Sequence, residues 1–415
     1  MAQLTTIDSG TITVNNYTLA MQLRLYTHYQ PPDDTFTFAQ KGIKVADWGD
    51  YNCAYDMNEF FLSPGKYALK LFDTDDYLKN EIFHLGTPTL DIIMVEVWLN
   101  GVSIFSGKGR DDSFSYDYKD KTISFDSYSS FDVLNTTMLV DGAGVATNPL
   151  TPNTNLDHAH GYVYKVKDII KWCYQLINPS ITENFYHDWY NFTTGGGGGI
   201  TNGTWDELYV QANLIMDNVG GYSYIFGDKL GDVLRGLAKS FFAMTGLIDE
   251  NNYFFVKLFY YNGGSLQDIG TIYSHVIEQK YHKISYVVIA DPILGKKEER
   301  PDSAHYTTVA DEFIEMSPTL NYFSVVRGGI PNALVNVTDP LIGTAKRMEK
   351  TLADLWYNYR SDPKHCRVDR ISVPHLNVDF FKNFLIGNSK YQIIGLTKRL
   401  GKSITEIEAL YLGEL

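Results

Sequence analysis

The most site-like stretch of this sequence holds two histidines, His158 and His160, directly after Asp157. Two histidines separated by one residue lie on the same side of a strand, where their imidazole rings can share a metal ion. A zinc site needs further ligands, and neither an HExxH helix nor another cluster of histidines or carboxylates accompanies this pair. We therefore interpret both histidines as loop residues and predict no metal site.

Two groups of neighbouring carboxylates are the next candidates. Residues 73–76, Asp-Thr-Asp-Asp, resemble the start of a calcium loop but lack its glycine at the sixth position and its glutamate at the twelfth. They fit the start of a short helix better, with Asp73 or Thr74 as its cap. Asp111 and Asp112 follow Arg110, and adjacent strand residues point to opposite faces, so they make a poor acid–base pair. We expect a solvated turn or an edge strand there.

Residues 395–403, GLTKRLGKS, come close to a phosphate-binding loop. That motif needs four residues between its glycines and a strand–loop–helix unit, whereas this stretch has five and lies in a predicted hairpin. The pair His187-Asp188 has no evident serine or cysteine partner. The sequence therefore predicts no catalytic, cofactor-binding or metal-binding residue, and a protein that is not an enzyme.

The aromatic residues suggest the main alternative to a structural role, which is sugar binding. Tryptophans with neighbouring tyrosines can build a sugar-binding groove, and the candidates are Trp172, Trp189, Trp205 and Trp356. Aromatic residues make up 14% of the chain, including 30 Tyr and 23 Phe. Such an excess is more often typical of strands, cores and protein interfaces.

Composition excludes several classes of protein. The formal net charge is −14 without a basic run, so tight phosphate binding is not expected. Cys53, Cys173 and Cys366 are far apart and odd in number, which favours buried thiols over a disulfide framework. We expect no signal peptide and no membrane-spanning segment.

Hydrophobic periodicity predicts the elements that would position any site. Alternation predicts strands over residues 17–29 and 66–72, and Asn100-Gly101 predicts the turn of a hairpin within residues 92–128. Residues 391–412 predict a closing hairpin around Leu400-Gly401-Lys402. Further strands are expected over 253–261 and 284–290, helices over 163–177, 228–247 and 343–360, and loops over 141–160, 195–199 and 295–306.

These elements predict an α+β fold that is predominantly antiparallel β. We expect two β-barrel-like tube domains with helix-containing segments between them. The predicted limits are a first barrel over 1–150, an α+β middle domain with a glycine-rich loop over 151–275, and a second barrel with one long helix over 276–415.

Three stretches resemble the hub proteins of bacteriophage tails, found in contractile-tail baseplates and at flexible tail tips. Residues 95–134, VEVWLNGVSIFSGKGRDDSFSYDYKDKTISFDSYSSFDVL, are similar to the family's paired hairpins. Residues 232–258, DVLRGLAKSFFAMTGLIDENNYFFVKL, resemble its helix with an aromatic end followed by a turn and a strand. Residues 391–412, YQIIGLTKRLGKSITEIEALYL, resemble the hairpin that completes its second barrel.

The resemblance implies a structural virion protein that is assembled in the host cytoplasm. In this family three subunits, each with two β barrels, form a pseudo-sixfold ring that joins the tail tube to the tip. The implied partners are copies of the chain in a homotrimer, a tail-tube or distal-tail protein, the tape-measure protein and tip fibre or spike proteins. DNA would pass through the lumen without specific binding, which suits an acidic chain.

Three alternatives stay open beside the hub. A carbohydrate-binding or receptor-binding tail-tip module predicts an exposed aromatic groove lined by Asp and Asn, for example around Trp189 and Trp205. A distal-tail ring protein would occupy the neighbouring position in the tail. A glycoside hydrolase or peptidoglycan-cleaving enzyme predicts a facing pair of carboxylates in a cleft, and the sequence indicates no preferred pair.

Overall fold

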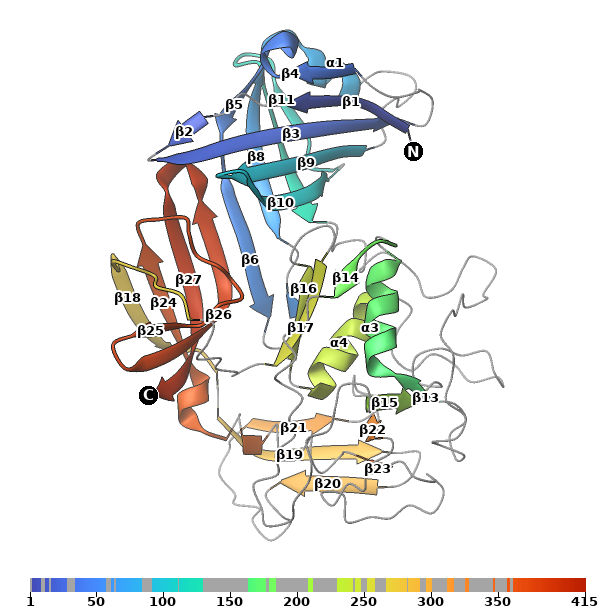
Figure 1. Cartoon of the computed structure of the whole chain (residues 1–415), viewed down its shortest axis with the longest axis vertical. Coiled ribbons are helices and arrows are strands. Elements are labelled where there is room, and N and C mark those ends of the chain that lie inside the picture. Colours follow the sequence, from blue (N-terminus) through green and yellow to red (C-terminus); the bar gives the residue numbers. More distant parts are fainter. Residues whose placement is uncertain are drawn as a thin grey trace.

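The computed structural model describes about three fifths of the chain, with gaps. The described residues are 2–8, 12–14, 16–27, 34–56, 61–62, 65–83, 92–110, 112–129, 163–176, 179–183, 208–211, 230–241, 243–247, 252–257, 266–281, 283–291, 296–300, 312–316, 325–327, 346–347, 357–358 and 361–415. They are predominantly antiparallel β structure with few helices, as the sequence predicts. A 17-stranded sheet and three small sheets contain the strands (Figure 1).

The N-terminal β unit is a half-barrel with the strand order β4-β1-β3-β9-β10-β12-β8-β5. Neighbouring strands are antiparallel except for β1 and β4. A 3₁₀ turn (Ala39–Lys41) connects β4 directly to β5. The strands are β1 (Ala2–Asp8), β3 (Tyr17–Thr27), β4 (Asp34–Thr37), β5 (Ile43–Asp47), β8 (Lys66–Asp73), β9 (Ile92–Leu99), β10 (Val102–Gly109) and β12 (Thr122–Ser129), with β2 (Ile12–Val14), β11 (Ser115–Asp117) and helix α1 (Tyr77–Ile82) at its margins.

Local sequence explains these strands well. Strand β8 alternates exposed and buried residues at every position, because successive side chains point to opposite faces of a sheet. In β3 the side chains of Leu19, Met21, Leu23 and Leu25 all enter the core. Asn100 and Gly101 have φ values of 51° and 78°, the left-handed pair that a type I′ hairpin turn requires. The strands predicted at 17–29 and 66–72 and the hairpins predicted within 92–128 are confirmed.

The C-terminal β unit is formed by β18 (Ser274–Gln279), β24 (Arg367–Val373), β25 (Phe384–Ile386), β26 (Ser389–Arg399) and β27 (Ile404–Glu414). Its strand order is β26-β27-β24-β18, with β25 on the other side of β26. The predicted closing hairpin is confirmed, since a 3₁₀ turn over Leu400–Lys402 connects β26 to β27. Strand β6 (Asp50–Asp56) lies between the two units (Figure 1).

The middle of the chain carries the described longer helices, α3 (Val166–Gln175) and α4 (Leu230–Phe241). Beside them lies a sheet of β14 (Thr182–Glu183), β17 (Asn252–Lys257) and β16 (Ala243–Leu247) (Figure 1). The Tyr174 ring of α3 stacks on Tyr253 with 4.5 Å between centroids, and its hydroxyl lies 2.6 Å from Thr245 Oγ1. Helix α3 therefore packs through its buried Tyr174 on the strand pair that follows α4.

The structure corrects three element predictions. The helix predicted over 228–247 ends at Phe241, because Ala243–Leu247 pairs with β17 instead. The charged loop predicted at 295–306 contains strand β20 (Lys296–Arg300), and this outer position beside β19 (Ile284–Asp291) suits charged side chains. Lys346–Arg347, placed in a predicted helix, forms β23 and pairs with β22 (Val325–Arg327). In each case pairing with another strand outweighs the local pattern on which the prediction rested.

The remaining described strands are β7 (Phe61–Leu62), β13 (Val163–Lys165), β15 (Leu208–Gln211) and β21 (Glu312–Met316). Strands β19, β20 and β21 form a sheet of their own, apart from the C-terminal β unit (Figure 1). The domain limits near residues 150 and 275 stay a prediction. Residues 141–160 and the glycines at 195–199 lie outside the described residues.

Candidate functional site

Strand β6 joins the two β units into one sheet. At its start, Tyr51 and Asn52 pair with Tyr67 and Lys66 of β8. On its other edge, Asp50 to Ala54 pair with Arg399 to Gly395 of β26. A single strand that is shared in this way couples the units through backbone hydrogen bonds, which resist sliding better than side-chain contacts do.

Two leucines of the C-terminal β unit insert into the core of the N-terminal unit. Leu376 and Leu400 are fully buried in the hydrophobic cluster that Leu19, Leu71 and Val97 also form. Burial of each leucine stabilises the junction by roughly 2 kcal/mol. We call the junction formed by β6, Leu376 and Leu400, together with the surface turns around it, the seam.

Hydrogen bonds and ion pairs also connect the elements at the seam. The Tyr17 hydroxyl accepts a hydrogen bond from the backbone N–H of Leu376 at 3.3 Å. Arg399 donates from Nη1 to Asp50 at 3.0 Å and from Nε to Glu406 at 2.8 Å. These carboxylates raise the pKa of the Arg399 guanidinium, first through the hydrogen bond that Arg399 donates to Glu406 and then through the charges of Glu406 and Asp50. The exposed ion pairs fix the register of β6 and β26 more than they stabilise the fold.

Lys398 is a buried cation in the same part of β26. Its side chain is only 9% exposed. Burial lowers the pKa of Lys398 to about 8, and the opposing attraction of Asp379 is smaller. A cation held in this environment makes the stability of the seam dependent on pH.

The outer edge of the C-terminal β unit is strand β18. Among the strands that the structure describes, β18 pairs only with β24. The side chains of Val276 and Ile277 are 50% and 59% exposed, and they point to opposite faces of the strand. An edge strand with apolar side chains exposed on both faces is a template for pairing with another chain.

A buried carboxylate anchors this edge strand. Asp369 on β24 is fully buried and accepts two hydrogen bonds from Arg367, at 2.6 and 2.7 Å. His275 Nε2 of β18 lies 2.6 Å from Asp369 Oδ2, and the Tyr391 hydroxyl donates to the same oxygen at 2.8 Å. Burial acts to raise the pKa of Asp369, but the hydrogen bonds from Arg367, His275 and Tyr391 together lower it below its ordinary value. The network holds three strands in one register.

The acidic residues at 73–76 act as a helix cap. The buried Asp73 carboxylate accepts hydrogen bonds from the backbone N–H groups of Leu78 and Lys79 at 3.2 and 2.8 Å, which satisfies two donors of the first turn of α1. Asp76 forms ion pairs with Lys79 at 3.4 Å and with Lys121 at 3.8 Å. The geometry agrees with the capping role predicted for Asp73.

The other sequence candidates do not come together. Arg110 binds Asp112 through Nη2 at 2.7 Å on the surface, and residues 395–403 form the predicted hairpin. Trp172 is buried on α3. The candidates outside the described residues are Asp111, Asp157, His158, His160, His187, Asp188, Trp189, Trp205 and Trp356.

The three cysteines are buried free thiols. Burial raises the pKa of Cys53 to about 12, and a hydrogen bond with Tyr51 opposes this only in part. Burial likewise raises the pKa of Cys173. Within the described ranges, no group of three His, Cys, Asp or Glu side chains is arranged to hold a metal ion. None of the helices in those ranges is both long and apolar enough to cross a membrane.

Sequence reasoning did not identify Asp369, His275 or β18. Arg367 and Asp369 are two residues apart, a spacing that places both on one face of a strand, and that is the available local signal. Nothing in the sequence around His275 indicates its carboxylate partner, which lies 94 residues away.

No family model and no curated protein matches this sequence. Among solved structures, it is similar to the 43 kDa tail protein of prophage MuSo2 from Shewanella oneidensis, with a TM-score of 0.45 and 11% identity over 89% of this chain and 97% of that one. The tail protein from Neisseria meningitidis MC58 has a TM-score of 0.44 and 10% identity over 89% and 96%. Prophage tail protein gp18 from Listeria monocytogenes EGD-e has a TM-score of 0.45 and 9% identity over 88% and 93%. At these values the likeness assigns no role to a residue of this chain.

Proposed function

We propose that this chain is a structural protein of a phage tail, a hub subunit at the tail tip that closes a ring with copies of itself. The sequence resemblance over residues 95–134, 232–258 and 391–412 supports the family. The paired hairpins in the first stretch and the closing hairpin in the third are present as β9 to β12 and as β26 with β27.

The observation that carries the proposal is the shared strand β6. It makes two curved β units into one continuous sheet, so that each copy supplies two consecutive β segments to a ring. A ring also needs, on each copy, an unpaired strand edge or apolar surface that a neighbouring copy can cover. The edge of β18, with Val276 and Ile277 exposed, is such a surface, and a head-to-tail contact through it generates a closed ring when the rotation fits.

The acidic composition suits a channel for DNA. With a net charge of −14, a lumen lined by this chain would repel phosphates and let a genome slide without sticking. The tail tube and the tape-measure protein would contact the ends of the ring. The tip fibre or spike proteins would contact its distal face.

The proposal is tested on the purified full chain by light scattering and electron microscopy at micromolar concentration. We expect a threefold ring with an open axis. A chain that stays monomeric and globular under these conditions would sink the proposal, and a plain sixfold ring would favour a distal-tail protein instead.

A matched pair of variants tests the contribution of the edge. Ile277→Lys places a charge on β18 and should shift the population from rings to monomers without changing the melting temperature of the monomer. Tyr118→Lys is the control, because Tyr118 is 77% exposed in a turn between β11 and β12. Loss of rings in both variants, or in neither, argues against β18 as the contact.

A further inference from the structure

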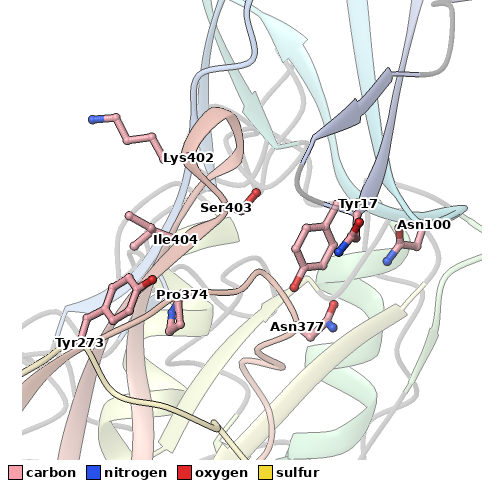
Figure 2. Close-up of a pocket in the computed structure, with 9 residues that line it drawn as sticks. Tyr17, Asn100, Tyr273, Pro374, Asn377, Lys402, Ser403 and Ile404 are labelled. Carbon is pink, nitrogen blue, oxygen red and sulfur yellow. The ribbon is translucent and has the colours of Figure 1, made fainter.

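A polar pocket of about 540 Å³ lies at the seam. The N-terminal β unit contributes Asn16, Tyr17 and Asn100, and the remaining lining residues are Tyr273, Pro374, Asn377, Lys402, Ser403 and Ile404. Figure 2 shows Tyr17 and Asn100 on one side of the pocket, with Tyr273, Pro374 and Ile404 on the other. The volume lies in the range of about 300–1,000 Å³ that is typical of small-molecule sites.

Tight turns present the polar side chains. Asn16, Asn100 and Ser403 have φ values of 70°, 51° and 54°, so each occupies the left-handed region at a turn beside a strand. Asparagine tolerates this region better than most residues do. The Asn100 carboxamide oxygen accepts the backbone N–H of Thr18 at 2.9 Å, which holds its amide nitrogen in place. The Asn100 amide is therefore positioned before any ligand arrives.

Several of these groups have unused hydrogen-bonding capacity. Within the part of the chain that the structure describes, the side chains of Asn16, Tyr273, Asn377 and Lys402 make no hydrogen bond or ion pair. A carboxamide offers both donors and an acceptor, which is the combination that neighbouring hydroxyl groups of a ligand require. No carboxylate is among the lining residues, so the pocket does not repel an acidic ligand.

The walls also carry apolar surface. Tyr17 is half-buried, and its hydroxyl is held by the Leu376 N–H, whereas Tyr273 is 65% exposed. Pro374 and Ile404 line the same pocket, on the side of Tyr273 in Figure 2. A tyrosine face presents an apolar body with a polar tip, which suits a ligand that has C–H groups on one face and hydroxyls at its rim.

We propose that this seam pocket binds a saccharide, a mono- or disaccharide unit whose hydroxyls bond Asn16, Asn100 and Asn377 and whose ring packs against Tyr273. Carboxamides that can donate to and accept from hydroxyl groups, beside a tyrosine face that can cover the C–H face of a ring, are chemistry that suits a sugar site. A phosphate site would need several cations, and Lys402 is the single lysine or arginine among the lining residues. The proposal goes beyond the structural role and does not depend on ring formation.

Saturation-transfer NMR on the full chain tests this, with a panel of neutral hexoses, N-acetylhexosamines and a uronic acid. Asn16→Gly removes one amide without backbone strain, since glycine adopts positive φ freely. Asn377→Ala and Tyr273→Ala remove a second amide and the ring. Each should weaken binding by about tenfold, while the exposed residues Asn80 and Tyr118 supply the controls Asn80→Ala and Tyr118→Ala.

The outcomes separate cleanly when circular dichroism shows that every variant is folded. Binding of any sugar in the panel that is lost in the three pocket variants and kept in the two controls supports the proposal. Absence of binding across the panel overturns it, and so does binding that all three pocket variants retain. If the uronic acid alone binds, Lys402→Met should weaken that binding while the melting temperature stays unchanged.

Discussion

The hydroxyl of Tyr55 donates a 2.7 Å hydrogen bond to the carbonyl oxygen of Ala243, across 188 residues of sequence. Tyr55 lies near the end of β6, and Ala243 is the first residue of β16. Strand β6 therefore contacts the N-terminal unit through β8, the C-terminal unit through β26 and the middle of the chain through this bond. A hydrogen bond buried between elements so distant in sequence forms only when the tertiary fold is complete.

Tyr55→Phe keeps the ring and removes this hydrogen bond. We expect a loss of about 1 kcal/mol in the free energy of unfolding, because the Ala243 carbonyl stays buried without that donor. The shift of the urea midpoint measures the effect, with the exposed Tyr118→Phe as the control. A midpoint equal to that of the unchanged chain would show that the bond contributes nothing.

Asp369→Ala should destabilise the chain at neutral pH by about 3 kcal/mol, because Arg367 and His275 lose a fully buried partner. The folded-state pKa of Asp369 is lowered, so its stabilising effect is complete above the ordinary aspartate pKa of about 4 and disappears as the pH falls through the folded-state pKa. The difference in unfolding free energy between the two proteins should thus narrow under acid.

Chemical unfolding at a series of pH values from neutral to acid measures this difference. Asp120→Asn, in the exposed turn before β12, is the control and should follow the unchanged chain throughout. A difference that stays constant across the series would refute the electrostatic part of the argument.

Lys398→Met tests the buried cation beside the seam. The folded-state pKa of Lys398 is about 8, below the ordinary value, so the unfolded chain holds the proton over a window in which the folded chain has lost it. Stability should therefore rise from pH 8 towards the ordinary lysine pKa of about 10.4, by roughly 3 kcal/mol from this residue alone.

The methionine variant should lack that rise, and Lys402→Met, on an exposed lysine, should retain it. Tyrosines and other lysines titrate in both proteins, so the comparison isolates Lys398. Equal slopes of unfolding free energy against pH in the variant and the unchanged chain would contradict the assignment.

The candidate site was only partly predictable. The cap at Asp73 could be inferred because capping is local. The hairpin over residues 395–403 could be separated from a phosphate loop by its glycine spacing and its predicted hairpin context. The seam pocket could not be inferred, since Tyr17 and Asn377 belong to different β units. The partners of Asp369 on β18 and β26 could not be inferred either, because the residues that form this network belong to no recognisable sequence motif.

The sequence by itself determined the elements whose causes are local. The alternation in β8, the Asn100-Gly101 turn and the apolar stripe of α3 each follow from a few neighbouring residues, and all three are in the structure. Only the tertiary structure decided that β6 pairs with β26, that Leu376 enters the N-terminal core, and that Ala243–Leu247 is a strand. Periodicity shows which face of a segment avoids water, but it does not show which segment covers that face or completes its backbone hydrogen bonds. For β6 and Leu376 these partners lie hundreds of residues away, and for Ala243–Leu247 the partner is the next strand, β17.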